Sequence, residues 1–229
     1  VGAHFLGRNG QTLAQLRDFS PATWNLLPRE RALVFTNNHD TQRGDGFSYR
    51  DGAAHDLATL FLLAWPYGRV VVASSYAFDG TSQAGRDRGP ASDQAGNTVR
   101  AMGCPAEPPP ASLPSGAWVC EHRRAPIAAM ATFRRVAGDA PVALWWDNGG
   151  NQIAFARQGR GFVVINNESA PLTRRFLLGL PAGRYCDVVR SGTAGSCADP
   201  IAVDVTGGAM IEVPARTARV YHLEARAVN

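Results

Sequence analysis

The sequence lacks lysine, long apolar runs and closely spaced pairs of cysteines. All 23 basic residues are arginines, scattered singly or in short pairs such as Arg123–Arg124 and Arg174–Arg175, and the formal net charge is +4. Proteins that bind nucleic acid usually gather their basic residues on one stripe, so we expect no nucleic-acid partner. No run reaches the roughly 18 apolar residues of a membrane-spanning helix, so we expect no membrane segment.

The length of 229 residues, 45% of them hydrophobic, is enough for one large domain or two small ones with a real core. The 24 glycines and 15 prolines predict many loops. The chain begins at Val1, and no charged segment followed by an apolar segment comes after it. We therefore expect a processed, trimmed or incomplete chain.

The four cysteines, Cys104, Cys120, Cys186 and Cys197, lie in loops rich in glycine and proline. They include no C-x2-C pair, and only His122 lies close to one of them, which is poor spacing for a zinc site. Four cysteines allow three disulfide connectivities, and we favour the nearest-neighbour one, Cys104–Cys120 and Cys186–Cys197. Disulfides are typical of exported proteins, so we expect an extracellular location.

Helical and strand patterns alternate up to about residue 138. The apolar runs RALVFT and RVVVAS flank the helical pattern DGAAHDLATLFLLAW, which is the order of a βαβ unit with a parallel sheet. Their continuous apolar character predicts strands that are buried on both faces. The helices are expected over residues 11–19, 51–65 and 121–136, and the strands over residues 31–36 and 69–74.

Short alternating runs replace the helical pattern after Gly138. Turn clusters rich in asparagine and glycine separate them. Eight short strands at regular spacing predict an antiparallel β-sandwich or Greek-key module. We therefore predict an α/β part in residues 1–138 and an all-β domain in residues 139–229. The eight runs are VALWWD, QIAFARQ, GFVVINN, RRFLLGL, GRYCDVV, IAVDVT, AMIEVP and RVYHLEA.

The polar residues Asn37, Asn38, His39 and Asp40 follow directly after the apolar run at residues 31–36. Functional groups of α/β folds gather at the carboxyl ends of parallel strands, so these side chains are candidates for a site. A single His-Asp pair is also compatible with a loop cap. A metal phosphohydrolase would need further His and Asp at helical spacing, which are missing from the sequence.

The string RALVFTNNHDTQRG, at residues 31–44, resembles a segment of the α-amylases of glycoside hydrolase family 13 that ends the seventh strand of their (β/α)8 barrel. Further strings with the same resemblance follow in the right order. The eighth-strand region is resembled by LAWPYG and SSYAF, and the last barrel helix with its preceding disulfide is resembled by WVCEHR. The C-terminal β-domain is resembled by residues 145–149, residues 151–167 and LPAGRYCDVV. The resemblance covers residues 31–223 and is closest to α-amylases of the animal and actinobacterial type.

This resemblance implies that residues 1–138 are the C-terminal part of a (β/α)8 TIM barrel, about strands 6–8, and that residues 139–229 are a Greek-key β-sandwich. It also implies retaining endo-hydrolysis of α-1,4-glucosidic bonds in starch and related α-glucans. Asp40 matches the carboxylate that stabilises the transition state, and Asp40 and His39 match residues that bind the sugar in the reacting subsite.

The resemblance also concerns two ions. Asn38 matches an Asn that helps to hold chloride in chloride-dependent members, but Val71 occupies the position of the Arg that this anion site needs. Arg69, two residues earlier, would compensate only if the chain shifted by about 7 Å, so we expect no chloride dependence. The calcium ligands of the family lie upstream of this chain, and we expect no metal ligand within it.

The segments that carry the nucleophile Asp and the general-acid Glu of this family have no counterpart in the sequence. We therefore expect a truncated α-amylase that is inactive as an isolated chain. The disulfides and the family indicate a secreted enzyme that acts on starch and is a monomer at full length. The alternative is a non-catalytic carbohydrate-binding or interaction module derived from an amylase.

Overall fold

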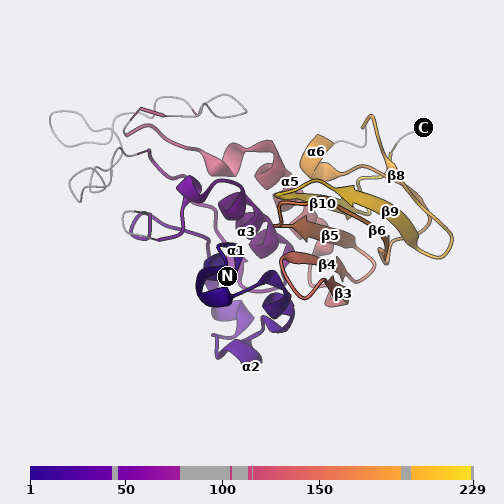
Figure 1. Ribbon diagram of the computed structural model, residues 1–229, viewed down its shortest axis with the longest axis horizontal. Helices are drawn as coiled ribbons and strands as arrows, with labels where there is room; N and C mark the ends of the chain where they lie inside the picture. Colours follow the sequence, from indigo (N-terminus) through magenta and orange to yellow (C-terminus); the bar gives the residue numbers. More distant parts are fainter. Residues whose placement is uncertain (43–45, 78–103, 105–112, 115, 192–196, 228–229) are drawn as a thin grey trace.

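Helical turns and two short strands make up the part before residue 138, and antiparallel strands make up the part after it (Figure 1). The computed structural model describes residues 1–42, 46–77, 104, 113–114, 116–191 and 197–227. No helix in these ranges is long and apolar enough to cross a membrane. Up to residue 138 the elements are α1 (Gly2–Phe5), η1 (Arg8–Gly10), η2 (Leu13–Asp18), α2 (Pro21–Trp24), η3 (Arg29–Arg31), β1 (Leu33–Val34), η4 (Tyr49–Asp51), α3 (Ala53–Ala64), β2 (Arg69–Val70), η5 (Glu121–Arg123) and α5 (Ala125–Ala137).

Two of the predicted helices are confirmed as α3 and α5. α3 starts after Gly52, whose backbone adopts a φ of 56°, and it ends just before Pro66, which cannot continue a helix. α5 carries Pro126 in its first turn, where a missing N–H costs no helical hydrogen bond. The helical pattern at residues 11–19 forms a 3-10 helix, η2, which begins with a capping box.

The predicted topology of the βαβ unit is confirmed, but the predicted burial of its two strands is not. β1 and β2 pair in parallel, with Leu33 opposite Arg69, and α3 lies between them in the chain. Each strand has two residues, and Leu33 and Phe35 are 59% and 40% exposed. The expectation of strands buried on both faces is therefore wrong, because in the described part of the chain β1 and β2 form a sheet of two strands on which Leu33 stays exposed.

All eight predicted strands are present, and they pair with one another antiparallel. The four-stranded sheet has the order β10-β5-β4-β3, while β6 pairs with β9 and β7 pairs with β8. The pairs β5–β10, β6–β9 and β7–β8 are nested along the chain, with β7–β8 innermost. These elements are β3 (Val142–Asp147), β4 (Gln152–Arg157), β5 (Gly161–Asn166), β6 (Leu172–Leu177), β7 (Gly183–Tyr185), α6 (Val188–Ser191), β8 (Ile201–Val203), β9 (Gly208–Val213) and β10 (Thr217–His222).

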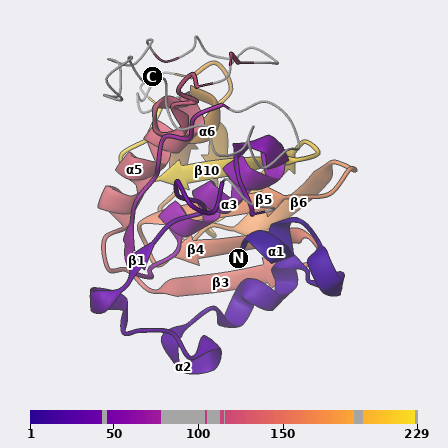
Figure 2. The ribbon, with the colours of Figure 1, turned by 90° about the vertical axis from the view of Figure 1, so that its left-hand side faces the viewer.

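The two central strands of the four-stranded sheet, β4 and β5, are buried on both faces. In β4, Ile153 and Phe155 belong to the core that α3 and α5 help to form, while Ala154 and Ala156 belong to the core shared with β6 and β9. β5 alternates in the same way, and every residue of both strands is buried. Figures 1 and 2 show α3 and α5 packed along this sheet. The helices therefore cover a face that an antiparallel sheet often leaves to solvent.

One aromatic cluster joins the helical part and the β-part of the chain. The ring of Phe155 lies 6.0 Å from Phe61, 5.2 Å from Trp65 and 5.9 Å from Trp145, measured between ring centroids. Such pairs add about 0.5–1.5 kcal/mol each beyond the burial of their area. One hydrophobic core thus contains residues from both sides of residue 138, so the helices and the strands stabilise one another.

His222 ends β10 and is buried, and among the described residues neither of its ring nitrogens has a hydrogen-bond partner. Its ring packs against Phe133 of α5 at 6.3 Å between centroids. Burial lowers the pKa of His222, because the charged imidazolium loses its hydration. Burial also lowers the pKa of His4, in α1.

We expect the chain to become less stable when the pH falls from 7 to 5. The unfolded chain takes up protons on these histidines near pH 6.5 and the folded chain does so only at lower pH, so acid favours unfolding. His222→Leu should raise the free energy of unfolding at pH 5 by about 1 kcal/mol and flatten its pH dependence. Urea unfolding at several pH values measures this, with the exposed His122→Leu as control. Equal pH dependence in the two variants would contradict the expectation.

Candidate functional site

The predicted site residues form an exposed turn that follows β1. The side-chain Oδ1 of Asn38 accepts hydrogen bonds from the backbone N–H groups of Asp40 and Thr41, at 3.0 and 2.9 Å. The backbone carbonyl of Asn38 accepts from the N–H of Gln42 at 3.1 Å, which closes the turn. Local bonds of this kind are the reason that asparagine is favoured in turns.

This turn brings His39 and Asp40 together at the surface. Their side chains are 71% and 73% exposed, and Nε2 of His39 lies 3.5 Å from Oδ1 of Asp40. A polar contact as exposed as this one contributes little to stability. Both side chains can therefore hydrogen-bond the hydroxyl groups of a ligand, the carboxylate as an acceptor and the imidazole as a donor or an acceptor.

Arg69 is not brought to Asn38. Arg69 starts β2 opposite Leu33, and Asn38 lies five residues further along the neighbouring segment. Five residues correspond to about 16 Å of extended chain, so Arg69 lies at the opposite end of the strand pair from the turn. Val71, at the position expected for an arginine, is 42% exposed. The structure thus does not assemble Asn38 and Arg69 into one anion site.

The described part of the chain contains no group of three or more His, Cys, Asp or Glu side chains that could hold a metal ion. Calcium takes six to eight oxygen ligands, several of them usually carboxylates. The described residues do not offer such a cluster, and we assign no role to calcium within them.

A buried polar network lies beneath the turn and was not predicted from the sequence. Asn37 is 2% exposed; its Nδ2 donates to Oγ of Ser75 at 2.9 Å, and its Oδ1 lies 2.9 Å from Nε2 of His55. The backbone N–H of Ser75 donates to the buried carboxylate of Glu121 at 2.8 Å. These residues come from four separate segments, so no local pattern marks them. One signal in the sequence is the polar His55 in the first turn of a mostly apolar helix.

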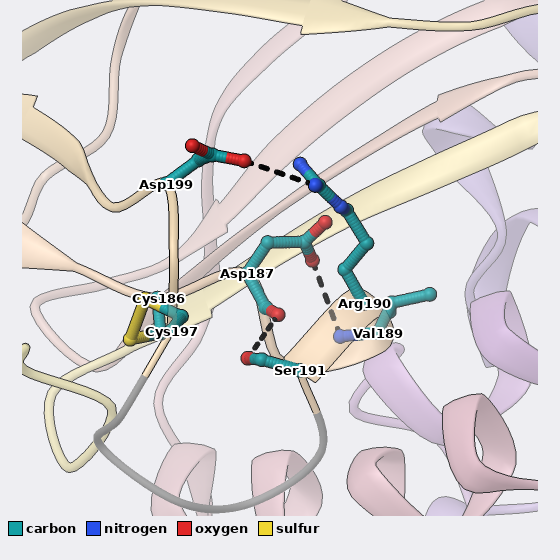
Figure 3. The surroundings of a disulfide bond; sticks show 7 residues. All are labelled: Cys186, Asp187, Val189, Arg190, Ser191, Cys197 and Asp199. Carbon is teal, nitrogen blue, oxygen red and sulfur yellow. Dashed lines mark hydrogen bonds and ion pairs between the residues drawn. A yellow bond between two sulfur atoms is a disulfide. The ribbon is translucent and has the colours of Figure 1, made fainter.

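Both predicted disulfides are present, Cys104–Cys120 and Cys186–Cys197, with Cα–Cα distances of 5.6 and 5.8 Å. Figure 3 shows the second disulfide beside Asp187, the residue before α6. One carboxylate oxygen of Asp187 accepts from a backbone N–H of α6 and from another of β10, and burial raises the pKa of this carboxyl. We infer that this carboxylate holds α6 against β10.

Comparison with known proteins gives a consistent result. Residues 145–224 match the family model of the α-amylase C-terminal all-β domain. The α-amylase of Streptomyces violaceus is 38% identical over 94% of this chain, and the pancreatic α-amylase 2a5 of Mus musculus is 38% identical over 79% of it. The chain spans only 33% and 36% of the lengths of these two relatives.

Solved structures show the same likeness in three dimensions. Wild-type α-amylase I of Eisenia fetida matches with a TM-score of 0.81 and 34% identity, over 97% of this chain and 47% of that one. A variant of the same enzyme, solved as a complex with maltohexaose, matches with a TM-score of 0.80. An α-amylase of Malbranchea cinnamomea, 14% identical with a TM-score of 0.60, shares the fold.

Proposed function

We propose that this chain, which is 38% identical over 94% of its residues to part of the Streptomyces violaceus α-amylase, is part of an α-amylase of glycoside hydrolase family 13 and acts in the hydrolysis of starch and related α-glucans. The reaction is the retaining cleavage of internal α-1,4-glucosidic bonds, in which a nucleophile and a general acid flank the sugar. The likeness to α-amylases in sequence and in fold, along nearly the whole chain, carries the proposal.

We further propose that residues 1–138 are the last part of a (β/α)8 barrel, about strands 6–8, and that residues 139–229 are a Greek-key sandwich. The parallel β1–α3–β2 unit supports the first assignment, and the nested antiparallel pairs support the second. Leu33 of β1 and Phe35, just after it, are exposed. Further barrel elements would cover these side chains.

Asp40 is the residue that we assign to catalysis. It stands in the string NNHD after a parallel strand, where barrels of this class place their functional groups. Its carboxylate would accept hydrogen bonds from hydroxyls of the sugar in the reacting subsite, and it would stabilise the positive charge of the oxocarbenium-like transition state. His39, 3.5 Å away, would bind the same sugar.

The assignment does not depend on chloride. Arg69 and Val71 do not supply a cation next to Asn38, so we propose activity that is independent of chloride. We also propose that the protein is an extracellular monomer, which fits its two disulfides. Calcium ligands, where the family uses them, would come from segments outside this chain.

The isolated 229-residue chain is expected to show no starch hydrolysis. Asp40 alone cannot serve as nucleophile, general acid and stabilising group at once, so the two other carboxylates must come from further segments. Release of reducing sugar from soluble starch by the purified chain is the measurement. Sustained hydrolysis by the pure chain would contradict the expectation.

A chimera provides the positive test of the proposed function. In this chimera, residues 1–229 replace the matching segment of the Streptomyces violaceus α-amylase, to which they are 38% identical. We expect the chimera to cleave starch and to release products that retain the α configuration, as followed by NMR of the fresh products. A folded chimera that binds starch without cleaving it would favour the alternative function, a non-catalytic carbohydrate-binding module.

A further inference from the structure

Asn37 and His55 tie the exposed turn to the core. Oδ1 of Asn37 lies 2.9 Å from Nε2 of His55. Because an amide oxygen can only accept, this contact assigns a proton to Nε2 of the imidazole. The amide nitrogen of Asn37 donates to Oγ of Ser75 at 2.9 Å. All three residues are at most 2% exposed, so water cannot replace a lost partner without opening the core.

Threonine hydroxyls tie the same end of the strand segment to α3. Oγ1 of Thr36 lies 3.1 Å from Oγ1 of Thr59, and Thr59 in turn donates to the backbone carbonyl of His55 at 3.0 Å. The first two turns of α3 therefore hold two consecutive residues of the chain, Thr36 through Thr59 and Asn37 through His55. Two adjacent fixed residues leave the chain little freedom in the direction in which it continues.

We propose that His55 is a positioning residue of the site: through Asn37 it fixes where the turn at residues 38–42 begins, and thereby how His39 and Asp40 face a glucan. The hydrogen bonds that the side chain of Asn38 makes are internal to the turn, so they fix its shape only while Asn37, the residue before the turn, is held in place. The orientation is set by the buried bonds that precede the turn. The part of this statement that concerns a glucan rests on the proposed function.

A purely structural role for His55 leads to different expectations. The ring of His55 packs against Phe47 at 5.3 Å between centroids, which a core-filling side chain would also do. In that case any side chain of similar size would serve, and the effect of a poor replacement would spread over α3. A positioning role needs the donor at Nε2. His55→Gln, which keeps an amide donor, should therefore substitute for histidine, and His55→Leu should not.

The test compares amide hydrogen exchange in the 229-residue chain and in its variants His55→Leu and His55→Gln. The reporters are the backbone N–H groups of Asp40 and Thr41, which donate to Oδ1 of Asn38. We expect exchange at both to rise about tenfold in His55→Leu, as for the loss of one ordinary hydrogen bond, and to stay within about twofold of the parent in His55→Gln. Ser75→Ala removes the other partner of the amide and should act like His55→Leu, which keeps the test decisive if His55→Leu does not fold.

Titration of the same variants with maltohexaose separates this inference from the proposed function. We expect His55→Leu to raise the dissociation constant about tenfold, and we expect Asp40→Ala, which removes both acceptor oxygens, to abolish the binding shifts. If Asp40→Ala binds like the parent chain, the proposed function fails, while the exchange rates still decide the role of His55. Unchanged exchange in His55→Leu, or an equal rise throughout α3, would overturn the positioning role.

Discussion

Replacing Arg157 by methionine is expected to lower the free energy of unfolding by about 3–5 kcal/mol. The guanidinium is completely buried and donates to the backbone carbonyls of Ala64, Gly138 and Ala140, each at 2.7 Å. Ala64 is the last residue of α3 and Gly138 is the C-cap of α5, so one side chain of β4 satisfies carbonyls at the ends of both helices. Methionine would leave the buried carbonyl of Ala64 unpaired, and the part-buried carbonyls of Gly138 and Ala140 would lose their donor.

The buried charge of Arg157 is stabilised by these carbonyls and by the helix ends that carry them. Burial is the main reason that the pKa of Arg157 falls to about 10, and the nearby guanidinium of Arg134 lowers it further. The side chain therefore remains charged at neutral pH. Arg134 donates to more carbonyls at the end of α3, including those of Leu63 and Trp65. The negative ends of helix dipoles favour cations at such positions.

Urea unfolding at pH 7 measures the effect of Arg157→Met. Arg160→Met is the matched control, because Arg160 is exposed and lies in the same hairpin; it should change the free energy of unfolding by less than about 0.5 kcal/mol. Arg157→Lys should lie between the two, since an ammonium keeps the charge but lacks the planar fork of donors. A loss below about 1 kcal/mol in Arg157→Met would show that the three carbonyls find other partners.

The fold could be predicted where the determining signals are local. Glycine and proline mark the ends of α3 and α5, and turn clusters separate the β-strands. The elements that cover each strand could not be predicted, because the amino-acid sequence of a strand does not specify which elements pack against it. Residues 152–157 and 161–166 are buried on both faces because helices pack on their sheet. Residues 31–36 are just as apolar, yet part of this run is exposed.

The same distinction applies to the site. The place of Asn38, His39 and Asp40 directly after β1 could be predicted from a local pattern, a polar string that follows an apolar run. The network of Asn37, His55, Ser75 and Glu121 could not, because bonded partners in it are separated by 18 to 46 positions. Whether Asn38 and Arg69 could form an anion site depended on side chains from two different segments, and the register between those segments is not visible in the sequence.

Asp40→Asn in the chimera with the Streptomyces violaceus α-amylase is expected to lower kcat for starch about a thousandfold with little change in KM. Asparagine has the size of aspartate and keeps an oxygen acceptor, but it lacks the negative charge that stabilises a developing oxocarbenium ion. An interaction that strengthens in the transition state affects kcat more than KM. The side chain of Asp40 is 73% exposed, so the substitution should change the free energy of unfolding by less than about 0.5 kcal/mol.

Steady-state starch hydrolysis by three forms of this chimera tests the assignment of Asp40 most directly: the parent, Asp40→Asn and the control Asp18→Asn. Asp18 is an exposed aspartate in η2, outside the turn that carries the site. The assignment predicts that Asp40→Asn loses about a thousandfold in kcat while Asp18→Asn keeps the activity of the parent. An Asp40→Asn chimera that unfolds at the same urea concentration as the parent and cleaves starch equally fast would contradict it.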